Sequence, residues 1–136
     1  KNSEINLTIV GEENEISKQF NYQNIKSMKI INNQDELIRL YDYHSVFILP
    51  SYTEGQPMAL IEALSRLRPA IIFKEIEHVI QNRDGIFTSD RNYESLLKTI
   101  KYVIKNYDNI QESMKKNNLP TNEEFINNLK KIITKN

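Results

Sequence analysis

Residues 46–73 read VFILPSYTEGQPMALIEALSRLRPAIIF, and this stretch decides the fold. Two apolar runs, at 46–49 and 70–73, bracket a polar turn and one helical period, which is typical of a βαβ unit in a parallel sheet. The first run is apolar at every position, so we expect a central strand that is buried on both faces. Pro57 suits the first helical position, because its missing N–H costs nothing there. The sequence therefore predicts an α/β fold with a Rossmann-like parallel sheet flanked by helices.

The helix predicted after Pro57 has two different faces. One face carries small and aliphatic residues that should pack on the sheet: Leu60, Ala63, Leu64 and Leu67. The other face carries Met58, Glu62, Ser65 and Arg66. Ligands of open parallel sheets bind outside the carboxyl ends of the strands, where helix N-termini favour anions. We expect an anionic group on the amides of residues 55–58, with Glu54 and Glu62 accepting hydrogen bonds from hydroxyls, as a phosphorylated polyol would require.

The segment PSYTEGQPMALIEALSRLRPAII resembles the donor-site signature of retaining GT-B glycosyltransferases of the group 1, family 4 type. In that signature two glutamates are separated by seven residues, as Glu54 and Glu62 are here. The resemblance implies that Glu54, the catalytic residue, contacts the transferred sugar and that Glu62 holds the ribose hydroxyls of the nucleotide. It also implies that the donor-binding loop includes Ser51, Gly55, Gln56, Pro57 and Met58. The alternative is that Glu54 is a turn residue and Glu62 a solvated helix residue, but the flanking matches favour the donor site.

The sequence before this stretch predicts two further strands with a weaker resemblance. A strand at 5–10 ends at Gly11, and Ile16 with Phe20 follows at helical spacing. Gly11 resembles the family's glycine turn beside the nucleotide, although the usual second glycine is absent, and it could simply end the strand. A second strand is predicted at 28–31, followed by Asn32, which the resemblance places near the base. Asn33 and Glu36 form a capping box that opens a helix through Tyr41, and for His44 we expect a structural or surface role.

After residue 73 the sequence departs from the family. The family has a glycine-rich loop and a Pro-Glu pair at this point, whereas this sequence has residues 74–78, KEIEH. His78 therefore stands at the usual glutamate position, and Arg68 stands where the family has a glycine. Either the donor differs or this half of the site has drifted. Asp84 and Gly85 should form a turn before a short edge strand at 86–88.

The remaining sequence is predicted to be helical. Asp90 should cap a helix whose apolar stripe covers the sheet: Tyr93, Leu96, Leu97, Ile100, Val103, Ile104 and Tyr107, continued by Ile110 and Met114. The pattern breaks at 117–119. Thr121 and Glu124 form another capping box, which opens a closing amphipathic helix within 120–136.

Composition excludes several classes of protein. The chain has 136 residues and equal numbers of basic and acidic side chains, 18 of each, so no overall charge attracts nucleic acid. It has no cysteine, which rules out disulfides and thiolate metal sites, and no apolar run of about 18 residues. P-loop, GxGxxG and HExxH motifs are missing. The resemblance to this family implies a cytoplasmic protein, or one at the cytoplasmic face of a membrane, that uses neither a metal nor a cofactor.

The resemblance implies that residues 1–136 form a single nucleotide-sugar-binding domain, the C-terminal half of a GT-B enzyme without its first βα unit. A missing N-terminal domain would bring a glycan or lipid acceptor, and the full-length protein could associate peripherally with a membrane. Two alternatives stay open. One is a sugar-nucleotide epimerase of the same fold, for which the Glu-Gly-x-Pro turn is less typical. The other is a non-catalytic doubly wound interaction module, in which we would expect strands ending in Asp.

Overall fold

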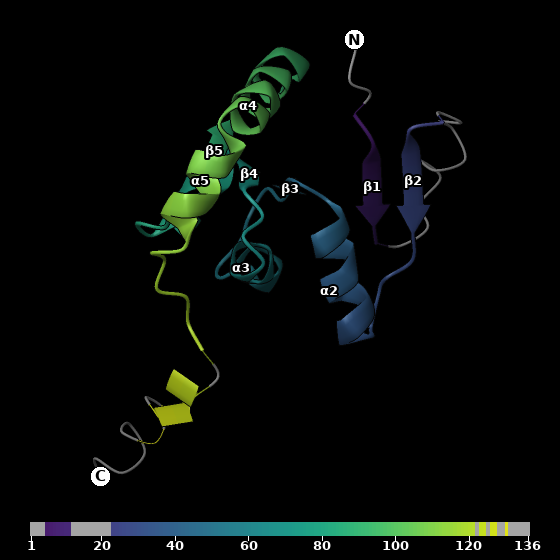
Figure 1. The fold of residues 1–136 in the computed structure, drawn as a ribbon. Helices are drawn as coiled ribbons and strands as arrows, with labels where there is room; N and C mark the ends of the chain where they lie inside the picture. The colour runs from purple at the N-terminus through teal and green to yellow at the C-terminus, as the bar shows by residue number, and fades with distance from the viewer. Residues whose placement is uncertain (1–4, 12–22, 122, 125, 128–129, 131–136) are drawn as a thin grey trace. The chain divides into compact units, whose positions relative to one another are not determined.

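The computed structural model describes residues 5–11, 23–121, 123–124, 126–127 and 130. These residues form an α/β fold in which every strand pairs in parallel with its neighbour (Figure 1). The chain divides into two compact units, Lys1–Leu40 and Tyr41–Asn136, and each is described by itself. The predicted fold class is therefore confirmed.

The first unit contains a two-stranded parallel sheet. Strand β1, Leu7–Val10, pairs with β2, Ile25–Met28, in a register that places Leu7 opposite Ile25. The Gly11 amide donates to the Met28 carbonyl at 3.1 Å, so Gly11 ends the strand as predicted. The prediction of a second strand at 28–31 is wrong by three residues, because β2 is only half apolar and its start is fixed by pairing with β1. The helical pattern around Ile16 and Phe20 lies outside the described residues.

Helix α2, Gln34–Tyr43, begins at the predicted cap and ends in the second unit. The Asn33 side chain accepts a hydrogen bond from the Glu36 amide at 3.0 Å, which confirms the cap.

The second unit is built on the predicted βαβ stretch. Strands β3, Phe47–Leu49, β4, Ala70–Phe73, and β5, Ile86–Ser89, lie in the order β3-β4-β5. Every residue of β4 is buried, whereas Phe47 and Ile48 are only half-buried. The prediction that residues 46–49 form the central strand is therefore wrong for this sheet, in which β4 has a strand on both sides. The predicted edge strand after the turn at Asp84 and Gly85 is confirmed as β5.

Helices cover this sheet and complete its core. Helix α3, Met58–Ser65, buries Leu60, Ala63 and Leu64 as predicted, and Ile61 in addition. A 3-10 segment, η1, Lys74–Ile80, adds Ile76 and Val79. The core cluster consists of Leu49, Leu60, Leu64, Ala70, Ile71, Ile72, Ile76, Val79, Ile86, Val103, Ile110 and Met114.

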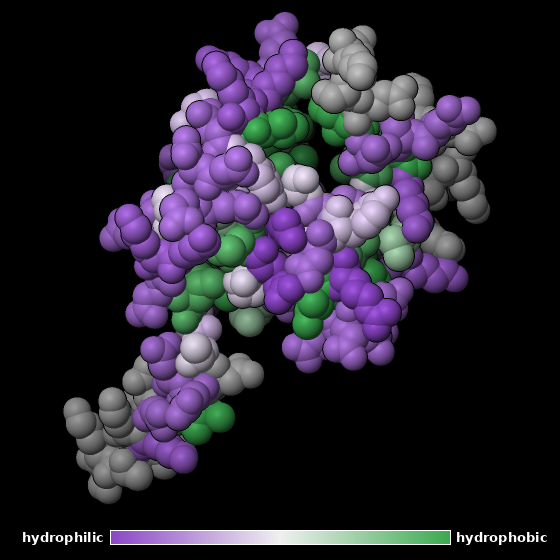
Figure 2. All heavy atoms as spheres, in the orientation of Figure 1, coloured by the Kyte–Doolittle hydropathy of each residue, from purple (hydrophilic) through white to green (hydrophobic). Residues whose placement is uncertain are grey.

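The long helical segment after β5 differs from its prediction in two ways. It forms two helices, α4, Tyr93–Lys105, and α5, Tyr107–Met114, and its cap is Asn92, whose side chain accepts from the Ser95 amide at 2.9 Å. Asp90 is not the cap, because it lies two residues before Asn92 and pairs with Lys74 instead. Val103, Ile110 and Met114 are buried, but Tyr93 and Ile104 are 76% and 54% exposed. Hydrophilic side chains cover the outer faces of both helices (Figure 2).

The segments that follow α5 are fixed by side-chain hydrogen bonds. The Asn117 side chain accepts from the Asp84 amide at 2.8 Å and donates to the Asp84 carbonyl at 2.9 Å, so it pairs with both polar groups of that residue. The predicted break at 117–119 is confirmed, as is the Thr121–Glu124 capping box, in which both hydrogen bonds form, at 3.1 and 3.2 Å. Much of the closing helix lies outside the described residues.

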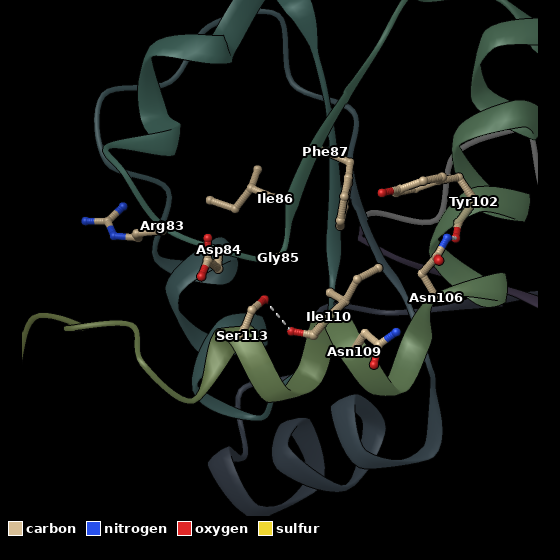
Figure 3. A pocket seen from close by; sticks show the side chains of 10 residues that line it. All are labelled: Arg83, Asp84, Gly85, Ile86, Phe87, Tyr102, Asn106, Asn109, Ile110 and Ser113. Atoms are coloured by element: carbon tan, nitrogen blue, oxygen red, sulfur yellow. Dashed lines mark hydrogen bonds between the residues drawn. The ribbon is translucent and has the colours of Figure 1, made fainter.

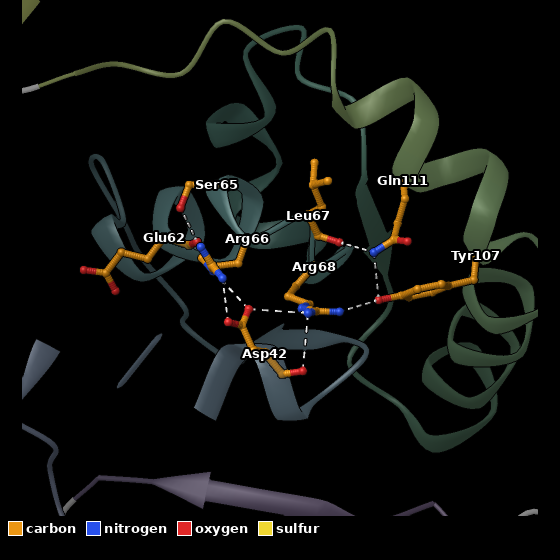
Figure 4. A network of polar contacts seen from close by, with 8 residues as sticks. All are labelled: Asp42, Glu62, Ser65, Arg66, Leu67, Arg68, Tyr107 and Gln111. Atoms are coloured by element: carbon orange, nitrogen blue, oxygen red, sulfur yellow. Dashed lines mark hydrogen bonds and ion pairs between the residues drawn. The ribbon is translucent and has the colours of Figure 1, made fainter. Parts of the chain in front are cut away.

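A polar network holds the end of α2 against the turn before β4 (Figure 4). Arg66 makes a two-fold ion pair with Asp42, and Arg68 contacts Asp42 and the Tyr107 hydroxyl. The backbone of Leu67 between them is left-handed, with φ of 54°, and its carbonyl accepts from Gln111 at 2.9 Å. Arg68 therefore takes part in packing at the amino end of β4, away from the carboxyl ends of the strands.

Candidate functional site

The candidate site lies at the carboxyl ends of the three strands in the second unit. Pro50 directly follows β3, Lys74 follows β4, and Asp90 follows β5. The sequence folds this way because an apolar strand ends at a proline and the chain then makes a polar turn before α3. Parallel strands present their free carboxyl ends on one side, so residues far apart in sequence meet there.

Glu54 is held by two contacts from different parts of this edge. The Ser51 hydroxyl donates to Glu54 Oε1 at 2.5 Å. His78 Nε2, from η1, lies 2.8 Å from the Glu54 carbonyl, and because a carbonyl only accepts, Nε2 carries the proton. Glu54 is half-buried, so both its carboxylate and its backbone are oriented.

Arg91 joins the ends of all three strands. Its guanidinium donates to the Pro50 carbonyl at 3.0 Å and the Ser51 carbonyl at 2.9 Å, and it pairs with Glu75 at 3.3 Å. It also lies over two aromatic rings, Tyr52 at 3.8 Å and Phe73 at 4.2 Å. The Glu75 carboxylate accepts hydrogen bonds from the Glu75 amide and from Arg91. These contacts, the first of them more strongly, lower the pKa of Glu75 and keep this carboxylate charged.

A second ion pair lies beside Arg91. Lys74 Nζ is 2.6 Å from Asp90 Oδ1, and this hydrogen bond and charge raise the pKa of Lys74. Both side chains are well exposed, so the pair is screened by solvent and contributes little stability.

Glu62 is not a plain solvated helix residue. The Tyr41 hydroxyl lies 3.2 Å from Glu62 Oε2 and also 3.2 Å from the Ala59 carbonyl. Burial raises the pKa of Tyr41, and the charge of Glu62 and the hydrogen bond to Glu62 raise it further, to far above its ordinary value. Figure 4 shows the Glu62 side chain pointing away from Arg66 and Asp42. Tyr41 therefore orients one carboxylate oxygen and leaves Glu62 outside the ion-pair network.

The other predicted donor-binding residues fall into two groups. Ser51, Gly55, Gln56, Pro57 and Met58 lie in the loop and at the start of α3, where Pro57 is the N-cap and not the first helical residue. Within the described residues no side chain caps this helix, and the Leu60 amide donates to the Pro57 carbonyl at 3.2 Å, so the amides of the first turn that remain free are those of Met58 and Ala59. Gly11 and Asn32 belong to the unit Lys1–Leu40, and their role as donor-binding residues stays a prediction.

Arg91, Glu75 and Tyr41 are site residues that sequence reasoning missed. Tyr41 lies 21 positions from Glu62, and Arg91 lies 40 positions from Ser51, so local patterns cannot pair them. The available signal for Arg91 and Glu75 was their place just after two predicted strands, because such residues gather at one edge of a parallel sheet.

A hollow of about 360 Å³ lies elsewhere, between the amino end of β5 and helices α4 and α5 (Figure 3). Gly85, Phe87, Tyr102, Asn106 and Ser113 line it, and it contains none of the residues predicted for the donor site. In the part of the chain that the structure describes, no cluster of three or more His, Asp or Glu side chains could hold a metal ion. Nor does any helix there have the length and apolar character needed to cross a bilayer.

Comparison with known proteins bears on what this arrangement does. The sequence profile of the family described as "Glycosyl transferases group 1" matches residues 1–120. The chain belongs to this family. A protein of Haemophilus influenzae, described as an uncharacterized glycosyltransferase, is 28% identical over 111 residues, which cover 74% of this chain. This group 1 glycosyltransferase chain spans only 31% of that relative's length. No solved structure matches it.

Proposed function

We propose that this chain is the donor-binding domain of a retaining GT-B glycosyltransferase that transfers a sugar from a nucleotide-sugar to a glycan or lipid acceptor. The observation that carries the proposal is the oriented pair of glutamates. Ser51 fixes Glu54 and Tyr41 fixes Glu62, and the two carboxylates keep the seven-residue separation of the donor-site signature. Family membership over residues 1–120 supports the same function.

In this proposal Glu62 binds the ribose of the nucleotide. Tyr41 contacts Oε2, which within the described residues leaves Oε1 open to accept from a hydroxyl. A carboxylate has about four acceptor positions, so Oε2 can keep Tyr41 and still accept from a second hydroxyl. The Tyr41 hydroxyl is protonated throughout the physiological range, as tyrosines ordinarily are, and its proton is shared between Glu62 and the Ala59 carbonyl.

Glu54 in turn contacts the sugar that is transferred. Its carboxylate lies in a loop whose backbone is held by Arg91 and His78, at the edge of the sheet where anionic ligands of α/β folds bind. The free amides of Met58 and Ala59 at the start of α3, together with the helix dipole, would face the phosphates between ribose and sugar. A negative charge beside the anomeric carbon stabilises the positive charge that develops there as the glycosidic bond to phosphate breaks.

The acceptor and the remaining machinery would come from parts of a longer protein. The chain covers less than a third of its Haemophilus relative, which leaves room for a further domain in that protein. We place the full-length protein in the cytoplasm or at the cytoplasmic face of a membrane, where nucleotide-activated sugars and lipid acceptors would meet.

The roles of the two glutamates are tested by calorimetry on the full-length protein with a nucleoside diphosphate and with its sugar conjugate. Glu62→Ala should weaken binding of the nucleoside diphosphate about ten- to a hundredfold, because charge-assisted hydrogen bonds contribute about 1.5 to 3 kcal/mol. Glu54→Ala should weaken only the sugar conjugate. Glu112→Ala, which removes an exposed glutamate paired with Lys115 on α5, is the matched control and should change neither affinity.

Circular dichroism must first show that all variants fold. Equal losses for Glu54→Ala and Glu62→Ala on the nucleoside diphosphate would contradict the assigned roles. Wild-type protein that binds neither ligand would contradict the proposed function as a whole.

A further inference from the structure

Arg91 is the most highly connected side chain at the carboxyl edge of the sheet. Its Nη1 and Nη2 atoms donate to two successive backbone carbonyls, those of Pro50 and Ser51, while Nε and Nη2 face Glu75 at 3.3 and 3.5 Å. The guanidinium carbon also lies over two aromatic rings, 3.8 Å from the centroid of Tyr52 and 4.2 Å from that of Phe73. The side chain is only 25% exposed.

These contacts separate Arg91 from a phosphate-binding arginine. Phosphate recognition by arginine uses the free fork of N–H groups, and here most of that fork is taken by carbonyls and a carboxylate. Its charge is neutralised by Glu75, which the lowered pKa of that residue keeps ionised. Arg91 is therefore placed to hold protein groups and not the ligand.

The backbone groups that Arg91 holds are connected to Glu54 through Ser51. Ser51 offers its carbonyl to Arg91 and its hydroxyl to Glu54, so the same residue links the guanidinium to the carboxylate. His78 fixes the loop from the other side through the Glu54 carbonyl. The loop after β3 is thus fastened to β5 through Arg91 and to η1 through His78.

We propose that Arg91 is a positioning residue, which through the Pro50 and Ser51 carbonyls sets the place of the Glu54 carboxylate at the donor sugar. This inference rests on the proposed function for the role of Glu54, but the fastening of the loop does not. Loss of Arg91 should loosen residues 51–56 and weaken the sugar-bearing ligand, while the nucleoside diphosphate, which Glu62 holds, keeps its affinity.

Two substitutions and a control test this role in the full-length protein. Arg91→Gln removes the charge and the fork, whereas Arg91→Lys keeps the charge but not the planar fork that spans two carbonyls. Arg83→Gln is the matched control, because Arg83 also donates to a backbone carbonyl, that of Val79 at 3.2 Å, but lies in the turn between η1 and β5. The readouts are amide hydrogen exchange at residues 51–56, which needs no ligand, and the affinities for a nucleoside diphosphate and its sugar conjugate.

Arg91→Gln and Arg91→Lys should both speed exchange at residues 51–56 about tenfold or more relative to amides of α4, and both should weaken the sugar conjugate about tenfold. Binding of the nucleoside diphosphate should stay within about twofold of wild type. In a double variant, adding Arg91→Gln to Glu54→Ala should cause little further loss of affinity for the sugar conjugate, because both changes remove the same contact with the sugar. Arg83→Gln should leave exchange and both affinities unchanged.

Three results would overturn the proposal. Unchanged exchange at residues 51–56 in Arg91→Gln would show that Arg91 does not hold the loop. Equal losses for both ligands, or recovery of wild-type affinity by Arg91→Lys, would indicate a direct electrostatic contact with phosphate. If wild-type protein binds neither ligand, the proposed function fails by itself, and the exchange measurement still decides whether Arg91 holds the Glu54 loop.

Discussion

The Tyr41 hydroxyl distinguishes Glu62 from an ordinary glutamate on a helix surface. It reaches the carboxylate from α2, and burial and the charge of Glu62 raise the pKa of this hydroxyl, so it stays a hydrogen-bond donor even in alkaline solution. A glutamate that is oriented before the ligand arrives loses less side-chain entropy on binding. By orienting the Glu62 carboxylate, Tyr41 should therefore lower the entropy cost of binding a ligand at Glu62.

Tyr41→Phe should lower the free energy of unfolding by about 1 kcal/mol at neutral pH, because it removes a half-buried hydrogen bond. Above pH 10.0, the ordinary pKa of tyrosine, the unfolded state loses this proton while the folded state keeps it. The stabilisation is thus complete below pH 10 and declines as the pH rises further. Denaturant unfolding at pH 7 and pH 11 should show a smaller difference between variant and wild type at pH 11, and a larger one would contradict the assignment.

Gly85→Ala should be the most destabilising small substitution among the described glycines. Gly85 has φ of 85°, and a Cβ there would overlap the buried Met114 side chain. A left-handed backbone costs an alanine about 1 kcal/mol or more and overpacking adds about 1 to 3 kcal/mol, so we expect a loss of about 2 to 4 kcal/mol. Gly55→Ala is the control for thermal unfolding, because a Cβ at Gly55 meets nothing within 4 Å. Similar melting temperatures for the two variants would refute this.

The candidate-site residues proposed from the sequence differ from those that were not in the sequence separation of their contacts. Glu54 and Glu62 could be proposed from the sequence because their spacing and flanking turn lie within one short segment, and their roles at a donor site stay predictions. The Ser51 contact with Glu54 spans three positions, whereas the contacts of Tyr41 and Arg91 span 21 and 40. Contacts of that length depend on how strands are ordered in the sheet, and no local pattern encodes them.

At the scale of elements, the start of α4 shows how closely two capping candidates can compete. Asp90 was predicted as the cap, and Asn92, which was not considered, is an equally good capping residue type. The structure gives the role to Asn92 because the Ser95 hydroxyl bonds to the Asp90 amide and Asp90 turns to Lys74. Helices α3 and α4 and the strands themselves were predictable from apolar periodicity, but their exact ends were not.

Asn92→Ala should therefore lower the free energy of unfolding by about 1 kcal/mol, the usual effect of losing an N-cap. Asp90→Ala should have a clearly smaller effect, since it removes only an exposed ion pair. Urea unfolding of both variants compares the two positions directly. A larger loss for Asp90→Ala would mean that Asp90 is the residue that stabilises the helix start.

At the scale of the whole molecule, the βαβ stretch predicted the parallel α/β class because its strand and helix periods are unambiguous. The division into two compact units at Leu40 and Tyr41 could not be predicted, since the boundary falls inside a continuous helix. The network of Asp42, Arg66, Arg68 and Tyr107 could not be predicted either, because its hydrogen-bonded pairs lie as much as 39 positions apart in sequence and meet only through packing.

Residues 1–136 expressed alone should not transfer sugar, even if they bind a nucleotide. In the proposed enzyme the acceptor site and the closure that excludes water come from another domain. Incubation with a panel of nucleotide-sugars and an acceptor extract, followed by mass spectrometry, should give product with the full-length protein and none with the isolated residues. Product from the isolated residues would show that they contain the whole catalytic machinery.

The Asn117 side chain has a consequence for the chemical ageing of the protein. Its amide both accepts from and donates to the backbone of Asp84, a pairing that only a carboxamide can make. Asparagine is thermolabile, and deamidation at this position would replace the donor with a second oxygen that faces the Asp84 carbonyl. Protein deamidated at Asn117 should therefore be less stable than the intact protein at the turn of Asp84 and Gly85 that leads into β5.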